Sequence, residues 1–284
     1  MKLIRYGSLG QEKIGVQIDT KNYDLSSFRE DYNEQFFEND GVERLKAFIK
    51  ENASELKEIP AGSRLGAPIA RPSKIVCIGL NYLDHATETG AAIPKEPIIF
   101  FKSTTSVVGP FDDIMLPKGS EKTDWEVEFG VVIGKTARYV EETNALAHVA
   151  GYVLINDVSE REFQLERGGT WDKGKGCDTF APMGPYLVTA DEMPDTSNVG
   201  LWLSVNGKMY QNGNTKNLIF SVPELIAYVS KFMTLLPGDV ISTGTPAGVG
   251  LGFKPPIYLK EGDVVELGAD GLGVAKQTVV AFNL

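Results

Sequence analysis

Two glutamates two residues apart, Glu126 and Glu128, form the most informative chemical pattern in the chain. They lie in an apolar run, residues 124–134, whose β-branched and aromatic residues favour a half-buried β-strand. Side chains alternate faces along a strand, so both carboxylates project to the same side, where they repel each other and are costly to desolvate. A divalent cation with oxygen ligands, Mg²⁺, Mn²⁺ or Ca²⁺, would relieve that cost. The alternative is a solvated edge strand with two surface glutamates.

A third carboxylate follows a second apolar run. Residues 151–156 are typical of a short buried strand, and Asp157 stands where polar residues begin. An acid at the end of such a strand can join a site at the rim of the sheet. Three carboxylates, with the other positions left to water or substrate, are a common arrangement for a catalytic divalent ion. Alternatively, Asp157 caps the helix that follows, since Asp is favoured there.

His85 is one of only two histidines and lies three residues before Glu88. If residues 82–89 are helical, the two side chains share a face. A carboxylate bonded to an imidazole holds its tautomer and raises its basicity, which suits a general base that activates water. The alternative is an incidental pair on a surface helix.

Two glycine-rich segments supply further polar groups. Residues 168–178 carry Lys173 and Lys175 but lack the spacing of a Walker phosphate-binding loop. A lysine close to a metal-bound substrate would stabilise enolate charge, whereas a merely solvated loop is the alternative. Residues 243–250 end a strand with backbone amides and Thr hydroxyls that are available to an anionic oxygen.

The composition is that of an ordinary globular protein. The chain has 284 residues and a formal net charge of −10, and this charge argues against nonspecific nucleic-acid binding. The two cysteines, Cys77 and Cys177, form no CxxC pair and are expected to be free thiols in a reducing compartment. No signal-peptide pattern opens the chain and no apolar run reaches membrane-spanning length, so we expect a cytoplasmic protein without membrane contact.

The elements that must position these residues are mostly short strands with Gly and Pro turns. A Pro- and Gly-rich segment near residue 70 predicts a boundary between a small N-terminal α+β domain, 1–70, and a larger domain, 71–284. The first domain is expected to begin with one or two strands, followed by a helix over 41–50. Strands in the second are expected at 74–79, 97–101, 186–189, 200–205, 239–243, 264–267 and 272–280.

Two further signals describe the larger domain. Asn206-Gly207 predicts a tight hairpin, because Asn-Gly favours the type I′ turn. Helical spacing over residues 221–233 begins with Ser221 and Glu224, which fit a capping box. The whole is expected to be a mostly β body with helices at its edges.

Taken together, the motifs resemble those of the fumarylacetoacetate hydrolase family. They occur in the family's order over about residues 72–284, and the ordered set is far more specific than any single motif. The matching elements are Gly79-x-Asn-Tyr-x-x-His85-Ala-x-Glu88, Phe100-Phe-Lys102, Glu126-Val-Glu128, Asp157, Arg161 with Gln164, Gly174-Lys175, residues 178–185 and residues 243–250.

The resemblance implies a mixed β-sandwich roll, usually in a homodimer, with Mg²⁺ or Mn²⁺ held by Glu126, Glu128 and Asp157. It implies His85 and Glu88 as a water-activating dyad on a lid helix. It also implies that Lys175 stabilises an enolate. The residues that would bind substrate are Tyr82, Lys102, Arg161, Gln164 and Thr245.

The implied reaction is hydrolysis of a carbon–carbon bond in a 2,4-diketo acid, which gives pyruvate and a second acid. The opening residues 1–7 resemble those of bacterial members that cleave 2,4-diketo-3-deoxy sugar acids, such as the fuconate or rhamnonate derivatives. We therefore expect a substrate of that kind. Alternatives on the same site are oxaloacetate decarboxylation, acylpyruvate cleavage, hydration or isomerisation of a dienoic acid, and ureidoglycolate cleavage. A non-catalytic metal-binding scaffold is an alternative of another class.

Two positions depart from the family pattern. Some acylpyruvate-cleaving members carry an arginine where this chain has Leu80, so its recognition of the substrate carboxylate is expected to differ. Many relatives have Ser-Phe after the glycine and lysine, where this chain has Gly176-Cys177. The lysine is retained, but the packing of its loop is expected to differ.

Overall fold

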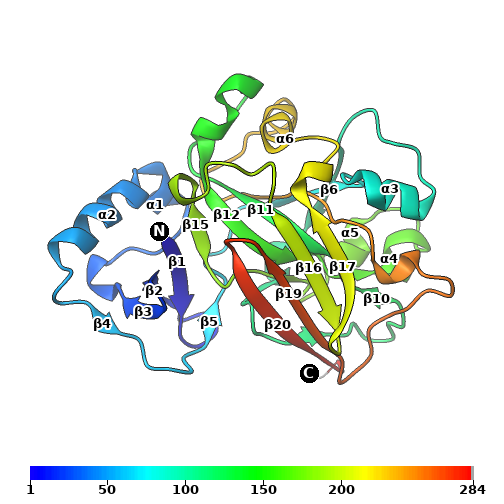
Figure 1. Cartoon of the computed structure of the whole chain (residues 1–284), viewed down its shortest axis with the longest axis horizontal. Coiled ribbons are helices and arrows are strands. Elements are labelled where there is room, and N and C mark those ends of the chain that lie inside the picture. Colours follow the sequence, from blue (N-terminus) through cyan, green and yellow to red (C-terminus); the bar gives the residue numbers. More distant parts are fainter. Residues whose placement is uncertain (283–284) are drawn as a thin grey trace.

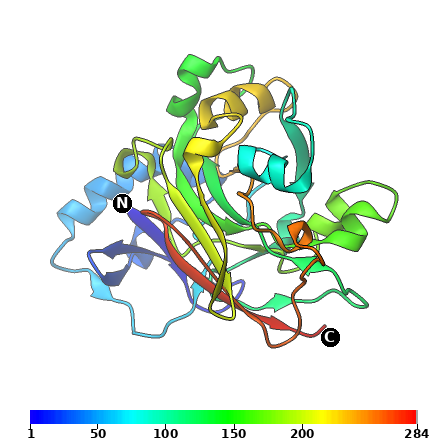
Figure 2. The same ribbon diagram turned by 45° about the vertical axis from the view of Figure 1, so that its right-hand side comes forward.

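Short strands dominate the computed structural model, which describes residues 1–282, and most of them form two sheets (Figures 1 and 2). The larger sheet has eleven strands in the order β4-β3-β2-β1-β15-β12-β11-β18-β6-β7, with β5 beside β1. Their bounds are β1 Lys2–Tyr6, β2 Lys13–Ile18, β3 Lys21–Asp24, β4 Lys57–Glu58, β5 Leu65–Gly66, β6 Ile75–Gly79, β7 Ile98–Lys102, β11 Val127–Ile133, β12 Val149–Asn156, β15 Leu187–Thr189 and β18 Val240–Ser242. The mostly β fold with mixed sheets that the sequence predicts is confirmed.

The second sheet has five strands and packs against β11 and β12 of the first. Its order is β17-β16-β19-β20-β9, with bounds β9 Ile114–Met115, β16 Gly200–Val205, β17 Lys208–Asn214, β19 Val264–Ala269 and β20 Gly273–Val280. Phe129, Leu203 and Leu267 are fully buried in the core between the sheets. Two small sheets complete the β structure, β10 Thr123–Asp124 with β13 Ser159–Glu160, and β8 Val107–Val108 with β14 Ala181–Pro182.

Strand β11 lies inside the larger sheet, between β12 and β18, and all seven of its residues are buried. Val127, Phe129 and Val131 belong to the core between the sheets. Alternation therefore turns Glu128 to the opposite face of the sheet. Gly130 shares that face, and a Cβ there would lie 2.5 Å from Ile155 Cδ1, so a larger residue would force the side chains of β12 to shift.

The N-terminal strands continue the larger sheet. Strand β1 pairs antiparallel with β2 on one side and β15 on the other, where Lys2 lies opposite Val188. A second core on this side of the molecule contains Leu3 and Leu45 together with Val153 and Leu187. The first 70 residues are thus joined by strand pairing to the rest of the chain, and their independence as a folding domain stays a prediction.

The helices lie around the sheets, and three of them, α3, α4 and α5, gather at the end away from the N-terminal strands (Figures 1 and 2). The predicted hairpin is confirmed, since Asn206 and Gly207 both have positive φ, 53° and 77°. The predicted capping box at Ser221 and Glu224 is also present, although the helix ends four residues earlier than expected. The helices are α1 Glu34–Glu38, α2 Gly41–Glu51, α3 Leu83–Thr89, α4 Arg161–Leu165, α5 Asp172–Lys175 and α6 Val222–Val229.

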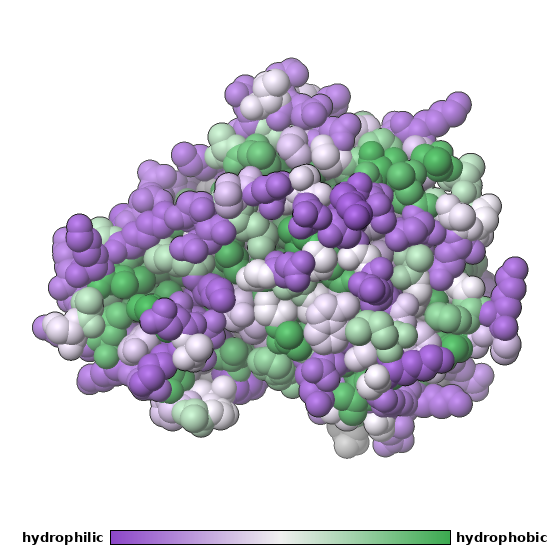
Figure 3. All heavy atoms as spheres, viewed as in Figure 1, coloured by the Kyte–Doolittle hydropathy of each residue, from purple (hydrophilic) through white to green (hydrophobic). Residues whose placement is uncertain are grey.

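The visible surface is largely hydrophilic, with hydrophobic side chains in smaller groups between the charged ones (Figure 3). Over the described residues 1–282, none of the helices combines the length and the apolar composition that crossing a bilayer requires.

Candidate active site

Three carboxylates meet where β11 begins and β12 ends. Val127 pairs with Asn156 across these strands, so Glu126 and Asp157 are neighbours, and the Asp157 N–H donates to the Glu126 carbonyl oxygen at 2.9 Å. One carboxylate oxygen each of Glu126, Glu128 and Asp157 lies within 4.8 Å of the others. All three side chains are buried, so the alternative of a solvated edge strand is wrong. These side chains are buried because β11 is an inner strand with β12 on one side and β18 on the other.

Asp157 does not cap the following helix. Helix α4 begins at Arg161, and its N-cap is Glu160, whose side chain accepts from the N–H of Glu162 at 3.2 Å. The Asp157 carboxylate instead accepts from two lysines, Lys102 at 2.5 Å and Lys175 at 2.9 Å. The alternative role considered from the sequence is therefore wrong, because another acid holds the helix terminus.

The three carboxylates have different electrostatic surroundings. Burial raises the pKa of Glu128 well above its usual value, and the charges of Asp157 and Glu126 raise it further. Burial also opposes ionisation of Glu126, but the cations of Lys175 and Arg161 outweigh it and lower the pKa of that group to about 2. Ser242 Oγ and the Gly244 N–H donate to Glu128 at 2.6 and 2.9 Å, and these two hydrogen bonds fix the orientation of its carboxylate.

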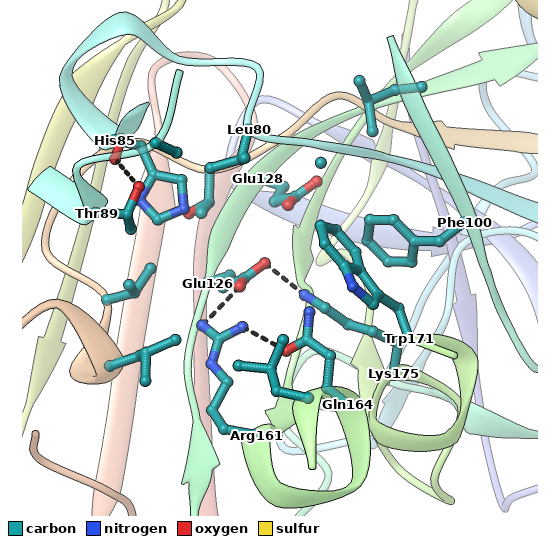
Figure 4. A pocket seen from close by; sticks show the side chains of 17 residues that line it. Leu80, His85, Thr89, Phe100, Glu126, Glu128, Arg161, Gln164, Trp171 and Lys175 are labelled. Atoms are coloured by element: carbon teal, nitrogen blue, oxygen red, sulfur yellow. Dashed lines mark hydrogen bonds and ion pairs between the residues drawn. The ribbon is translucent and has the colours of Figure 1, made fainter. Parts of the chain in front are cut away.

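Lys175 and Arg161 both reach Glu126 (Figure 4). Lys175 Nζ lies 2.7 Å from Glu126 Oε2 and 2.9 Å from Asp157 Oδ2, so it bridges two carboxylates of the cluster. Burial alone would lower the pKa of Lys175, but Asp157 and Glu126 together raise it. Lys175 is therefore a permanent cation in the site. Its neighbour Lys173 is exposed and donates to the Arg167 carbonyl oxygen.

The donor set fits a hard divalent ion. The cluster combines only carboxylate oxygens in one buried place, the ligand type that Mg²⁺, Mn²⁺ and Ca²⁺ prefer. With Glu128 ionised, one negative charge around the cluster would be unbalanced, because four buried carboxylates would face three buried cations: Asp124, Glu126, Glu128 and Asp157 against Lys102, Arg161 and Lys175. A divalent ion would compensate this charge and the repulsion that raises the pKa of Glu128.

His85 and Glu88 lie on helix α3 at the mouth of the same site. His85 Nδ1 is 3.3 Å from Glu88 Oε2, and both side chains are largely buried. The Gly248 N–H donates to both Glu88 oxygens. A Cβ on Gly252 would lie 2.5 Å from Glu88 Cδ, so a larger residue there would displace this carboxylate from its position. These contacts do not match an incidental pair on an open surface.

A cavity of about 170 Å³ joins the histidine to the carboxylates. Figure 4 shows Leu80, Phe100 and Trp171 around it, together with the charged groups. Its polar lining comes from α3, β11, α4, α5 and the segment after β18. The polar residues are His85, Thr89, Glu126, Glu128, Arg161, Gln164, Lys175 and Thr245, and the others are Ile78, Gly79, Leu80, Ala91, Phe100, Leu165, Trp171, Val249 and Leu251.

The predicted substrate-binding residues divide into two groups. Arg161, Gln164 and Thr245 line the cavity. Lys102 does not, because its ammonium is fully buried between Asp157 and the Val158 carbonyl oxygen. Tyr82 does not line it either, and its hydroxyl is buried with no hydrogen-bond partner among the described residues. Both side chains lie behind the first layer of the site.

Asp124 is a central residue that the sequence patterns did not indicate. Its carboxylate is fully buried and pairs with Arg161 through Nε and Nη2, both at 2.8 Å. The N–H groups of Gly250 and Leu251 also donate to it, at 2.7 and 2.9 Å. Asp124 therefore orients Arg161 and anchors part of the cavity wall. A signal was present in the sequence, since an acid stands two residues before Glu126 in an apolar run.

Gln211 is a second such residue. Its side chain accepts from the Val127 N–H at 2.9 Å and donates to Thr245 Oγ1 at 2.8 Å. Thr245 Oγ1 in turn donates to the Val127 carbonyl oxygen at 2.9 Å. This network fixes Thr245 beside β11. Gln211 belongs to β17 of the other sheet, so no local sequence pattern could connect it with this site.

Comparison with known proteins agrees with this geometry. Residues 74–280 match the family described as Fumarylacetoacetate (FAA) hydrolase C-terminal. A Burkholderia multivorans protein, named provisionally as a hydrolase, is 54% identical over 275 residues, which is 96% of each chain.

Two solved structures are similar over their full length. Fumarylacetoacetate hydrolase from Exiguobacterium antarcticum is 36% identical with a TM-score of 0.85, covering 99% of this chain and 100% of that one. Maleylpyruvate hydrolase from Sphingobium sp. SYK-6, in complex with manganese(II) ion and pyruvate, is 29% identical with a TM-score of 0.82, covering 100% of both chains. The sequence, the fold and the buried carboxylates lead to one assignment: the chain belongs to the fumarylacetoacetate hydrolase family.

Proposed function

We propose that this protein is a divalent-metal-dependent hydrolase that cleaves a carbon–carbon bond in a 2,4-diketo acid, giving pyruvate and a second acid. The observation that carries the proposal is the shared cavity. His85, which is paired with Glu88 on α3, lines the same cavity as Glu126, Glu128 and Lys175. The manganese and pyruvate in the Sphingobium maleylpyruvate hydrolase complex support a metal and a pyruvate product here.

In this proposal, Glu126, Glu128 and Asp157 hold the metal. The ion would act as a Lewis acid toward the oxygens of the diketo head and would help to stabilise negative charge on them. Lys175 and Arg161 keep fixed positive charge beside Glu126, next to the same head. Gln164 accepts from Arg161 Nη1 at 3.0 Å, so the guanidinium is held in one orientation for a substrate oxygen.

His85 is the proposed general base. It removes a proton from a water molecule while the water oxygen attacks the C4 carbonyl, and Glu88 holds the imidazole in the productive tautomer. The bond between C3 and C4 then breaks, and its electron pair stays on C3 as a pyruvate enolate. Lys175 stabilises this charge. Proton return to C3 gives pyruvate, while C4 leaves as the carboxylate of the second acid.

The finer substrate assignment is also a proposal. A 2,4-diketo-3-deoxy sugar acid of the fuconate or rhamnonate type is our preferred substrate, on the resemblance of residues 1–7. Decarboxylation of oxaloacetate and isomerisation or hydration of a dienoic acid need the same electron sink, so they are the competing reactions. We further propose a homodimer in the cytoplasm with Mg²⁺ or Mn²⁺ as the working metal, and light scattering of the purified protein tests the dimer.

Pyruvate release tests the function directly. We would assay acylpyruvates, diketo-deoxy sugar acids and oxaloacetate, before and after chelation and with Mg²⁺ or Mn²⁺ returned. The proposal expects metal-dependent release of pyruvate and an equal amount of second acid from a diketo acid. Release from oxaloacetate alone would replace hydrolysis by decarboxylation.

A variant separates the roles of the residues. His85→Ala is expected to abolish turnover and to leave metal affinity intact, because the imidazole is not among the three carboxylate ligands. Loss of metal binding in this variant would show that His85 has been assigned wrongly.

A further inference from the structure

The cavity lining combines a few charged groups with a larger number of apolar side chains. Arg161 and Lys175 gather around Glu126, Phe100 and Trp171 lie beside Lys175, and Leu80 lies near His85 (Figure 4). Ala91, Leu165, Val249 and Leu251 also line the cavity, and together with Leu80, Phe100 and Trp171 they form what we call the apolar wall. We propose that this apolar wall receives the substrate tail beyond the C4 carbonyl, and that it selects a tail that is uncharged and ends in an apolar group. This inference rests on the proposed function, whose substrate class it narrows.

No free cation is available for a second carboxylate. Among the described residues that line the cavity, the only basic side chains besides His85 are Arg161 and Lys175. Arg161 is already bound to Asp124, Glu126 and Gln164. Lys175 bridges two carboxylates of the metal cluster. A carboxylate at the far end of a substrate would therefore lose its hydration without gaining a partner.

Leu80 is held in an unusual conformation that places it in this wall. Its φ is 52°, in the left-handed region that a leucine rarely adopts. Strained backbone of this kind is concentrated at functional sites, where the surrounding structure enforces it. Here Asn81 supplies that enforcement, because its buried side chain is bonded to the Thr243 and Phe220 carbonyl oxygens and to the Phe220 N–H.

Trp171 completes the wall through a close approach to the backbone. A Cβ on Gly79 would lie 2.6 Å from the Trp171 ring, so glycine is what lets the indole pack there. The indole also makes an edge contact with Phe100, with ring centroids 5.3 Å apart. The close approach at Gly79 thus fixes Trp171, and the hydrogen bonds of Asn81 fix Leu80, in the lining of the cavity. A rigid apolar wall discriminates weakly between tails of different length but strongly against an unpaired charge.

A matched pair of substrates tests the inference. The two acids 2,4-dioxoheptanoate and 2,4-dioxoheptanedioate share the diketo head and the chain length, and they differ only in a terminal methyl or carboxylate. We expect kcat/KM for pyruvate release to be at least about 100-fold higher for the methyl-ended acid. Leu80→Arg should reduce this ratio by at least about 10-fold, mainly through faster cleavage of the dicarboxylate. The control Leu80→Met should keep the ratio.

Binding provides a readout that does not depend on turnover. Calorimetry with His85→Ala should show the same order of affinities for the two acids. Equal or reversed preference in the unmodified protein would overturn the inference. An unchanged ratio in Leu80→Arg would overturn the assignment to Leu80, and Leu251→Arg would replace this variant if it failed to fold. Failure to release pyruvate from any diketo acid would count against the proposed function instead, while the calorimetric preference would still decide the nature of the tail.

Discussion

The backbone N–H of Gly248 donates to both carboxylate oxygens of Glu88, at 3.0 and 3.1 Å, although the two residues are 160 positions apart in the chain. This contact ties helix α3 to the segment that follows β18. Glu88 thus has two tasks, because it also lies 3.3 Å from His85. The orientation of the proposed base, His85, therefore depends on a loop that holds Glu88 through a backbone N–H and not through a charged side chain.

Replacement of Glu88 by glutamine tests this dependence. The amide keeps the shape of the side chain but removes the charge that stabilises an imidazolium, so we expect kcat to fall by about 100-fold or more with little change in KM. Metal affinity should stay constant. Glu43→Gln on the exposed side of α2 is the control. Steady-state kinetics check the outcome, and an unchanged kcat would remove Glu88 from the catalytic dyad.

Metal removal should destabilise the protein. A divalent ion that binds the folded state at 100 times its Kd stabilises it by about 2.7 kcal/mol, which corresponds to a rise in Tm of about 5 °C or more for a chain of this size. We expect this rise when Mn²⁺ or Mg²⁺ is added to chelated protein in a thermal-shift assay. Asp157→Asn should largely abolish it. An equal shift in that variant would place the metal elsewhere.

The chelated protein should also lose stability as the pH rises. The pKa of Glu128 is raised in the folded state from an ordinary value of 4.5, so folding favours its neutral form. That stabilisation is complete below the unfolded pKa and is lost progressively as the pH climbs from about 4.5 toward the raised folded value. Glu128→Gln should therefore gain stability over the unmodified protein above this range. Denaturant unfolding in chelator at pH 4 and pH 8 provides the comparison. If the difference in the free energy of unfolding between the two proteins were the same at both pH values, the expectation would be wrong.

Asp124 offers a test of a residue that lies outside the cavity lining. Asp124→Asn leaves the Arg161 guanidinium with one carboxylate fewer in a buried place, where such a loss costs about 3–5 kcal/mol. We expect a lower Tm and a kcat/KM reduced by about 10-fold or more, because Arg161 and the wall at Leu251 lose a common anchor. Glu162→Gln breaks the exposed pair with Arg167 and should change neither quantity measurably. If both variants lowered Tm and kcat/KM to a similar extent, the role of Asp124 would be its negative charge alone and not its contacts with Arg161 and Leu251.

Local patterns were sufficient for the carboxylate cluster. Alternation along one strand places Glu126 and Glu128 on the same side, and the end of the next apolar run indicates Asp157. Both predictions concern β11 and β12, two strands that pair directly with each other in the sheet, so patterns within each strand were enough to bring the three carboxylates together. The His85–Glu88 pair follows from helical spacing in the same way.

The contacts between distant segments were beyond such patterns. Lys102 and Tyr82 are held outside the cavity lining by contacts with distant residues, Asp157 for Lys102 and Leu218 for Tyr82, and no spacing rule reports such contacts. Gln211 comes from the second sheet. The strained backbone of Leu80 is enforced by hydrogen bonds to residues about 140 to 160 positions away, which only the folded chain reveals.

The pairing of β1 with β15 has a consequence for synthesis on the ribosome. Met1 donates to Thr189, a residue 188 positions later, so β1 cannot meet β15, its neighbour toward the middle of the sheet, until most of the chain has been made. At about 5–20 residues per second this delay is on the order of 10 to 40 seconds, far longer than a hairpin needs to form. Until then, the nascent β1–β2 hairpin has an unpaired edge at the start of β1, where β15 pairs in the folded protein. Lys2 and Arg5 in β1 are charges of the kind that discourage such an edge from pairing with another growing chain.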